Sequence, residues 1–340
     1  MSLNDIWYAL FVVVIAGYVI LDGFDLGVGI LHLFVARTDE ERRMTLNSIG
    51  PIWDGNEVWL VVGGGVLFAA FPIVYAALFS GFYAAMMLIL LFLILRAVAI
   101  EFRSKRESTG WRRSWDVVFA VASYALALLL GVAFGNVISG IPITRSGDVQ
   151  ISSILDLLKP FPIVIGLTAI AMLALHGALY LQVKTEDPIH RRVHRAIPAL
   201  MVVFALLGVL AVVMMLVKHY GVVDVYERDI WPVIVPLAAG AAFVMIRVSS
   251  ARGRDGAAFL SSSIMLAVLL ISGGIGIYPN LLTSTIDPAY DMTVTNAASS
   301  STSLTVMLIV AIVGLPFVLL YTAGVQYLFR GKVRLSPDSY

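Results

Sequence analysis

Cysteine is missing from this chain of 340 residues, and charged residues make up only 13% of it. Without cysteine the chain cannot form disulfides, hold thiolate-ligated clusters or attach a c-type haem covalently. The net charge of +1 gives no indication of nucleic-acid binding. Histidine is also scarce, with five residues. Functions that depend on cysteine thiols are therefore excluded, and nothing in the charge balance points to a nucleic-acid partner.

Apolar residues are what the chain has in excess, at 60% with a mean hydropathy of +0.93. A typical soluble domain is roughly 45–50% apolar and about 25% charged. The N-terminus MSLND lacks the basic region of a signal peptide, and the apolar run behind it exceeds the usual signal length. We therefore expect a retained first transmembrane helix and a single polytopic membrane domain over residues 1–340.

About nine segments are apolar over the roughly 20 residues that a membrane span requires. They lie near 6–35, 51–71, 73–102, 115–138, 160–183, 197–217, 231–249, 257–278 and 304–329. Pro72 can begin the third helix, because its missing N–H costs little in a first turn. The segments predict an all-α integral membrane protein, since a closed barrel would need short alternating strands.

Basic residues predict the orientation of these spans. All but four of the 23 lysines and arginines follow the first, third, fifth, seventh and ninth segments. The four on the opposite side are Arg145, Lys159, Lys218 and Arg228. By the positive-inside rule, the N-terminus lies outside and the C-terminus is cytoplasmic.

Four acids fall inside or at the edge of the first two segments. Asp22 and Asp25 lie three residues apart in the first, and Asp54 and Glu57 lie three apart in the second. Each pair shares a helix face, and the predicted orientation places all four in the cytoplasmic leaflet. Because an acid at membrane depth is costly, such residues usually mark a functional path. We predict that they serve proton transfer.

A structural alternative stands beside this prediction. A first-turn Asp can cap its helix, and paired acids can neutralise arginines such as Arg42, Arg43 or Arg96. For Glu57 both interpretations stay open. For Asp22, Asp25 and Asp54 together we favour function, because a buried charge is an expensive way to hold helices together.

Histidines give no consistent ligand set. Only His32 and His176 lie in or near spans, and a histidine in apolar surroundings is usually a core residue. His190 and His194 lie four apart in the basic stretch HRRVH, which we expect at a solvated interface. We predict no metal, no haem and no catalytic residue in this chain.

Two further features concern packing and the outer side. Most tryptophans fit the role of interfacial anchors, but Trp59 lies deeper and beside the acids. The glycines after it, in VVGGGVLFAA, permit close packing or leave space for a small apolar molecule. The Ser- and Thr-rich segment 283–303 is expected to be a solvated loop.

Several ordered blocks resemble subunit II of the cytochrome bd-type quinol oxidases. They are DGFDLGVG at 22–29, ERRMTLNSIGPIWDGNEVWL at 41–60, LFAAFPIVYAALFSGFY at 67–83, FRSK at 102–105, GVAFGN at 131–136 and LHGALYLQVKT at 175–185. They recur in order over roughly the first half of the chain, with weaker similarity to its end.

The resemblance implies two four-helix bundles plus a peripheral ninth helix, in a bacterial cytoplasmic (inner) membrane. It implies a heterodimer with subunit I, which holds two haems b and one haem d, oxidises quinol and reduces dioxygen to water. Small single-span accessory subunits and a structural quinone or lipid are compatible with it. It assigns Asp54 to a cytoplasmic proton path and Trp59 to an oxygen route, and assigns Asp22 and Asp25 less specifically.

The chain also departs from the family. Glu57 and His176 stand where some members have glutamine, so neither is an obligatory carrier or ligand there. A rival hypothesis is a proton-coupled secondary transporter, because glycine-interrupted helices with intramembrane acids mark those proteins too. Against it, the acids lie near one face of the first two helices, not at the midplane of two repeats.

Overall fold

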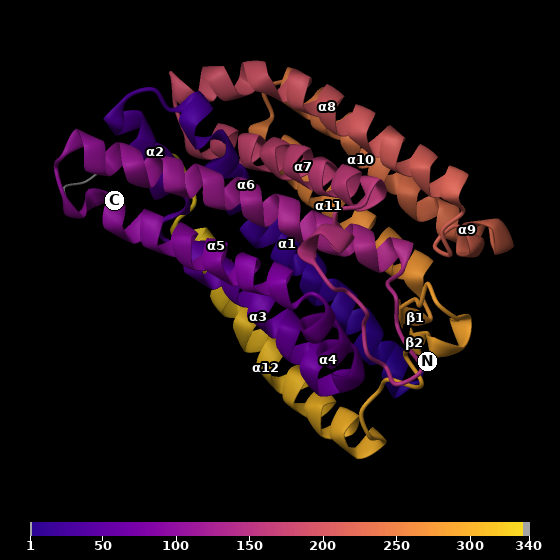
Figure 1. The fold of residues 1–340 in the computed structure, drawn as a ribbon. Coiled ribbons are helices and arrows are strands. Elements are labelled where there is room, and N and C mark those ends of the chain that lie inside the picture. The colour runs from indigo at the N-terminus through magenta and orange to yellow at the C-terminus, as the bar shows by residue number, and fades with distance from the viewer. Residues whose placement is uncertain (1, 336–340) are drawn as a thin grey trace.

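The computed structural model of the protein describes residues 2–335, which form an elongated array of long helices (Figure 1). Those of the first half are α1 (Leu3–Val35), α2 (Asp39–Ile49), α3 (Trp53–Ala70), α4 (Pro72–Gly81), α5 (Tyr83–Phe102), η1 (Arg103–Lys105), α6 (Thr109–Ser139) and η2 (Ile154–Leu157). Those of the second half are α7 (Pro160–Lys184), α8 (Ile189–Lys218), α9 (Asp224–Arg228), η3 (Trp231–Val233), α10 (Ile234–Ala251), α11 (Asp255–Ile277), η4 (Pro288–Tyr290) and α12 (Ser301–Leu328). The strands are β1 (Asn280–Leu282) and β2 (Met292–Thr293).

Within residues 2–335, eight helices are long and apolar enough to cross a membrane. Each overlaps one of the expected segments, and the protein is a mostly helical, multi-pass membrane protein. The remaining segment, 51–71, is α3, which is helical over 18 residues but begins with the polar stretch Trp53–Glu57. Its crossing of the membrane stays a prediction.

The segment 73–102 was expected to be one helix, and this expectation is wrong. The helix is interrupted at Phe82, where φ is −96° and ψ is 21°, and the chain forms α4 and then α5. Pro72 opens α4 as expected. Phe71 and Phe82 flank α4 and are both buried, so each break inserts a phenyl ring into the core.

Helix α1 is the centre of the array, in contact with α3, α6, α7 and α11 (Figure 1). Its residues 22–32 are all buried, although the stretch includes Asp22, Asp25 and His32. The close approach has a cause at Gly27 and Gly177, because a Cβ on either glycine would clash with the backbone of the other helix. The first helix is therefore enclosed by protein at the depth of its acids.

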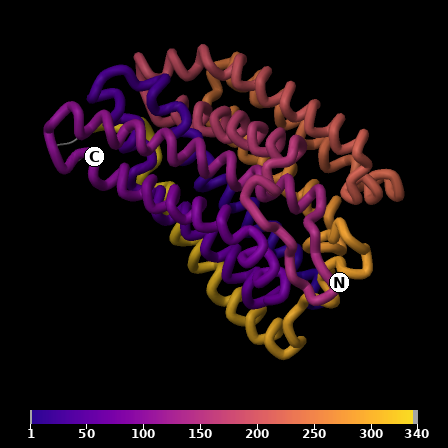
Figure 2. The backbone as a smooth tube through the Cα atoms, in the orientation of Figure 1, coloured from indigo at the N-terminus to yellow at the C-terminus, as the bar shows by residue number. Residues whose placement is uncertain are grey.

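The two ends of the array differ in structure. The N-terminus lies near β1 and β2, while α2 and the C-terminal end lie at the opposite end (Figures 1 and 2). Thr38 and Glu41 form a capping box that begins α2. The first and last described residues, Ser2 and Leu335, therefore lie at opposite ends of the array, and the orientation of the array in the membrane stays a prediction.

The segment 283–303, expected to be a solvated loop, is instead partly folded. Strand β1 pairs with β2 antiparallel, and Met292, Val294 and Ala297 are buried. Ile141, from the connection after α6, forms a bridge with Ser284. Apolar residues spaced through the Ser- and Thr-rich sequence supply this small core at the end near the N-terminus.

Helix α12 is the least enclosed of the long helices. Leu304 is its only buried residue, whereas α1 is buried continuously over residues 22–32. It runs along α3 and α1 at one edge of the array (Figure 1). Its apolar side chains therefore face lipid or another chain.

Candidate functional site

Asp22 and Asp25 lie deep inside the helix array. Their exposed fractions are 0% and 1%, because α3, α6, α7 and α11 surround this part of α1. Their spacing of three residues keeps both on neighbouring positions of one face. The prediction that these acids face protein, not lipid, is met by this geometry.

Arg96 of α5 links α1 to α3 by pairing with an acid on each helix. Its Nη2 atom lies 2.7 Å from Asp22 Oδ1 and 2.8 Å from Glu57 Oε2. The arginine is 1% exposed, whereas the Glu57 side chain is 22% exposed. The structural alternative, in which acids neutralise Arg96, is therefore met at Asp22 and Glu57. One arginine can balance the charge of only one of these two carboxylates.

Asp25 has a different partner. Asn56 Nδ2 donates to Asp25 Oδ2 at 2.8 Å, and Asn56 is itself buried. Asp25 Oδ1, Arg96 Nη1 and the Tyr18 hydroxyl have no hydrogen-bond partner among residues 2–335. Buried polar atoms are normally paired, so these atoms are places where ordered water or a moving proton can be accommodated.

We call Asp22, Asp25, Asn56, Glu57 and Arg96 the acid cluster. It contains three carboxyl groups and one cation, and α1, α3 and α5 contribute its members. With three carboxyl groups and one arginine, the cluster is neutral when two of the carboxyl groups hold protons. This state is favoured because a net charge is costly at membrane depth. The arrangement is suited to binding and releasing protons.

Asp54 lies one turn before Glu57 on α3 and is exposed in this chain. The structure does not pair its side chain with the buried acids, since the Asp54 carboxylate has no hydrogen bond or ion pair within residues 2–335. It instead begins a stripe of exposed residues along α3. The stripe consists of Asp54, Gly55, Val58, Val61, Val62, Gly65 and Phe68.

Trp59 faces the opposite side of α3 and is buried at 7% exposure. Its ring packs on Gly17 of α1, where a Cβ would lie 2.8 Å from Trp59 Cε3. Val14 and Tyr18 complete its surroundings. Trp59 is therefore an internal packing residue of this chain and not an interfacial anchor.

The three glycines after Trp59 have two different environments. A Cβ on Gly63 would come within 2.7 Å of Ile15, so this glycine allows α1 and α3 to pack closely. A Cβ on Gly64 or Gly65 would meet nothing within 4 Å. Both interpretations of the glycine run, close packing and open space, thus hold at different residues.

An apolar cavity of about 230 Å³ lies beyond Trp59, toward the end that holds the N-terminus. Ile15, Leu67, Phe82 and Phe134 line it, and they come from α1, α3, the break before α5, and α6. It has room for a small apolar molecule.

A second group of buried charges lies at the other end of α1. Asp116 of α6 accepts from His32 Nε2 at 2.8 Å, from Arg103 Nε at 2.6 Å and from Arg42 Nη1 at 2.9 Å. Arg103 also pairs with Asp39, which pairs with Arg112. We call this set the ion-pair network: His32, Asp39, Arg42, Arg103, Arg112 and Asp116.

Glu41 of α2 fastens the same end to α8. Both its oxygens accept from Arg192, at 2.6 and 3.0 Å. Hydrogen bonding to Arg192 lowers the pKa of the Glu41 carboxyl below its ordinary value, and backbone N–H groups of Arg37 and Thr38 add to the effect. This acid is therefore a structural anion.

The two buried histidines are both engaged by protein groups. His176 Nε2 lies 3.0 Å from the Ile20 carbonyl, and Nδ1 lies 2.7 Å from Ser262 Oγ. His32 Nδ1 lies 2.8 Å from Thr45 Oγ1, opposite its contact with Asp116. Over residues 2–335, no group of three His, Asp or Glu side chains has metal-site geometry.

Sequence reasoning missed several members of these two groups. Asn56 was not singled out, although it stands between Asp54 and Glu57 in the same polar turn. Asp116 lies one residue inside the fourth expected segment, and this position was the available signal. Arg103 and Arg112 were counted only for orientation, because charge counting cannot show which basic residues turn inward.

The chain matches one known protein family over nearly its whole length. The family model for "Cytochrome bd terminal oxidase subunit II" matches residues 3–329. Cytochrome bd-I ubiquinol oxidase subunit 2 of Escherichia coli K12 is 37% identical, over 97% of this chain and 95% of that protein. Cytochrome bd ubiquinol oxidase subunit 2 of Bacillus subtilis is 33% identical, over 98% and 97%.

A solved structure shares the fold. The structure of bd oxidase from Geobacillus thermodenitrificans superposes with a TM-score of 0.79, covering 97% of this chain and 99% of that chain. The two chains are 16% identical, so this likeness concerns the arrangement of helices alone.

Proposed function

This chain belongs to the cytochrome bd terminal oxidase subunit II family, and we propose that its acid cluster conducts protons toward the oxygen-reducing site of the complex. The family consists of subunits of membrane-bound quinol oxidases, which reduce dioxygen to water. The rival hypothesis of a proton-coupled transporter is not favoured by these relatives. The observation that carries the proposal is that Asp22 and Glu57 share one buried cation, Arg96, while the nearby Asp25 has only the neutral Asn56 as a partner.

The proposed path begins at Asp54, which is exposed at the first turn of α3. Glu57 lies one turn further along the helix and is 22% exposed, so it can exchange protons with Asp54 through water. Arg96 Nη2 then bridges Glu57 and Asp22. Asp25, held by Asn56, is the further buried acceptor on α1. The first and last steps join groups one turn apart on a single helix, and the middle step passes between helices at Arg96.

The exposure of Asp54 also indicates where the partner subunit binds. An acid that is exposed on a helix at membrane depth cannot face lipid cheaply. The α3 stripe is otherwise apolar, and its Gly55 and Gly65 leave room for a closely packed neighbour. We infer that the haem-bearing subunit I covers the stripe, which would place Asp54 at the boundary between the two chains.

The haems would be held by subunit I, two haems b and one haem d, where quinol is oxidised. This chain would scaffold that subunit, and its two buried histidines are already engaged. We further propose nine spans, counting α3, in two four-helix bundles with α12 peripheral. The N-terminus would lie outside and the C-terminus inside a bacterial cytoplasmic membrane.

An apolar route for dioxygen past Trp59 is a second part of the proposal. The apolar cavity and Trp59 both adjoin α1 and α3, and dioxygen partitions into apolar space. Replacing Trp59 by Phe should change the apparent KM for dioxygen more than kcat. An unchanged KM in the assembled complex would remove Trp59 from the route.

The test of the proton path is Asp54→Asn in the purified complex. We expect quinol oxidase turnover to fall by roughly tenfold or more, as for the loss of one proton-transferring group. Haem absorbance and the ratio of subunits should stay unchanged. The matched control is Asp229→Asn, another exposed acid, placed outside the long helices. Normal turnover of the assembled Asp54→Asn complex would contradict the path, and lost haem absorbance would assign Asp54 a structural role.

A further inference from the structure

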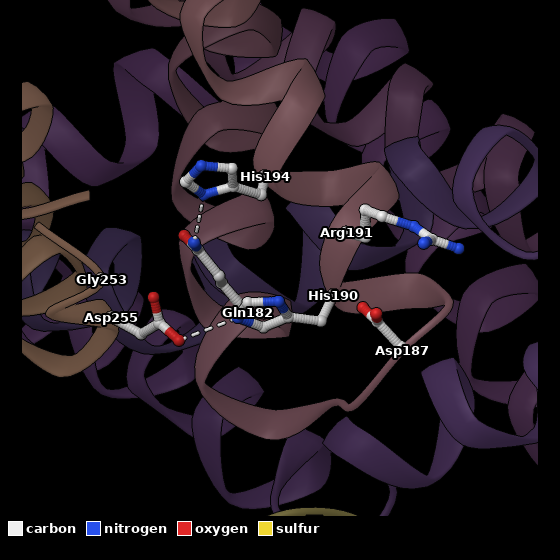
Figure 3. A pocket seen from close by; sticks show the side chains of 7 residues that line it. All are labelled: Gln182, Asp187, His190, Arg191, His194, Gly253 and Asp255. Atoms are coloured by element: carbon white, nitrogen blue, oxygen red, sulfur yellow. Dashed lines mark hydrogen bonds and ion pairs between the residues drawn. The ribbon is translucent and has the colours of Figure 1, made fainter. Parts of the chain in front are cut away.

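A second cavity, of about 300 Å³, lies where α7 ends and α8 and α11 begin (Figure 3). It shares no residue with the acid cluster or with the ion-pair network. Its lining is polar and contains both signs of charge, unlike the apolar cavity near the N-terminus. It lies at the end of the array that contains α2, where the long helices leave the predicted membrane.

Two hydrogen-bond acceptors in this cavity lack a donor. Gln182 is fully buried, and its Nε2 donates to His194 Nδ1 at 2.8 Å while its Oε1 has no partner among residues 2–335. Asp255 Oδ2 accepts from His190 Nε2 at 2.9 Å, and its Oδ1 likewise has none in the described part. Leaving such atoms unpaired is costly. A ligand that reaches these atoms would satisfy them by donating hydrogen bonds.

Two exposed side chains at the rim carry opposite charges. Asp187 and Arg191 both line the cavity, and neither forms an ion pair within residues 2–335. His194 adds a donor, because its Nδ1 accepts from Gln182 and the neutral ring then has its hydrogen on Nε2. The lining thus includes both acceptors for a cation and donors for an anion.

The surroundings indicate a lipid and not a free solute. On α8 the exposed positions continue from Arg191 through Pro198 and Val202 to Leu206, which is 67% exposed. These positions follow one helix face, so an apolar surface leads from the cavity toward the middle of the predicted membrane. A headgroup in the cavity would have its acyl chains along this face.

We propose that this cavity binds the headgroup of a phosphatidylethanolamine-type lipid. Its ammonium group would donate to Asp187, Asp255 and Gln182. Its phosphate would accept from Arg191 and His194. Phosphatidylcholine has the same charges but no N–H to satisfy the acceptors, and phosphatidylglycerol has no cation. The chemistry therefore separates these three lipids, and the proposal holds whether or not the acid cluster conducts protons.

The experiment is native mass spectrometry of the delipidated two-subunit complex with an equimolar mixture of the three lipids. We expect the wild type to retain phosphatidylethanolamine with about a tenfold preference over the other two, as two or three charge-assisted hydrogen bonds would give. Asp187→Asn and Arg191→Gln should each reduce this preference severalfold. Both residues are exposed without ion pairs, so both variants should fold.

Matched controls are Asp229→Asn and Arg113→Gln, which change the same charges on exposed side chains elsewhere. Loss of preference in the cavity variants but not in the controls supports the site. Equal retention of the three lipids, a preference for phosphatidylglycerol, or an unchanged preference in both cavity variants would overturn it. Competition by soluble phosphoethanolamine as strong as by the lipid would assign the cavity to a free solute instead.

Discussion

Buried carboxylates occur in two regions along α1, and the two regions differ in how completely the acids are paired. In the ion-pair network, Asp116 accepts from His32, Arg42 and Arg103 through both of its oxygens. In the acid cluster, Asp25 accepts from a neutral amide through one oxygen, and its other oxygen has no partner among residues 2–335.

This difference in pairing distinguishes acids that stabilise the fold from acids that can transfer protons. A carboxylate surrounded by cations is held ionised and joins helices together. In the acid cluster one arginine serves both Asp22 and Glu57, and Asp25 has only a neutral amide, so a carboxyl group there can exist with or without its proton at a small difference in cost. The same residue type, a few turns apart on neighbouring helices, thus has two roles, which the following substitutions test in order of expected effect.

The largest effect is expected for Asp116→Asn. The change removes the only carboxylate bonded to Arg42 in the described part and leaves the buried Arg103 with Asp39 alone, and arginine cannot lose its charge. We expect destabilisation by about 3–5 kcal/mol. Thermal unfolding of the purified complex, with Asp229→Asn as control, measures it. A stability within about 1 kcal/mol of wild type would mean that the network is not structural.

A smaller loss of stability is expected for Arg96→Gln. The partners left behind, Asp22 and Glu57, can take up protons and so avoid an unpaired charge. We expect a loss of about 1–3 kcal/mol at neutral pH that grows as the pH is raised. Unfolding temperatures over a pH series measure it. A loss as large as that of Asp116→Asn at every pH would remove the contrast between the regions.

Gly17→Ala tests the packing beside the acid cluster without changing charge. The added methyl group would lie 2.8 Å from the Trp59 ring, so the ring or one of the two helices must shift. We expect about 1–2 kcal/mol of destabilisation. Gly208→Ala is the control, because nothing lies within 4 Å of a Cβ there. Equal unfolding temperatures for the two variants would show that Trp59 does not fix the spacing of α1 and α3.

The smallest effect is expected for Glu41→Gln. The pKa of Glu41 is lowered in the folded protein from its ordinary value of 4.5, chiefly by Arg192. Its stabilisation is therefore fully present above pH 4.5 and is lost as the pH falls through the lowered pKa. We expect the variant to lose about 0.5–1 kcal/mol at pH 7, and the difference from wild type to shrink in acid. A difference independent of pH would contradict this role.

The sequence was sufficient to predict eight of the long helices and the burial of Asp22 and Asp25. Averaged hydropathy identifies spans, and the three-residue spacing predicts a shared face. It was not sufficient to predict the break at Phe82, because an uninterrupted apolar run hides a change of direction. It also could not separate Arg96, which turns inward to the acids, from the exposed arginines near it, since that depends on how α5 is rotated against α1.

The outer segment 283–303 gives the converse lesson. Its Ser and Thr content predicted solvation, yet two of its own residues, Met292 and Val294, are buried. A few apolar residues at suitable spacing are enough to fold a short polar segment onto the end of a helix array. Composition alone does not reveal such spacing.

The most direct test of the central claim is the rate of proton uptake during dioxygen reduction by the complex in lipid vesicles. It compares Asp25→Asn in the acid cluster with Asp39→Asn in the ion-pair network. The account predicts uptake roughly tenfold slower for Asp25→Asn and unchanged for Asp39→Asn, with haem absorbance intact in both. Wild-type uptake by the assembled Asp25→Asn complex, or equal slowing in both variants, would contradict it.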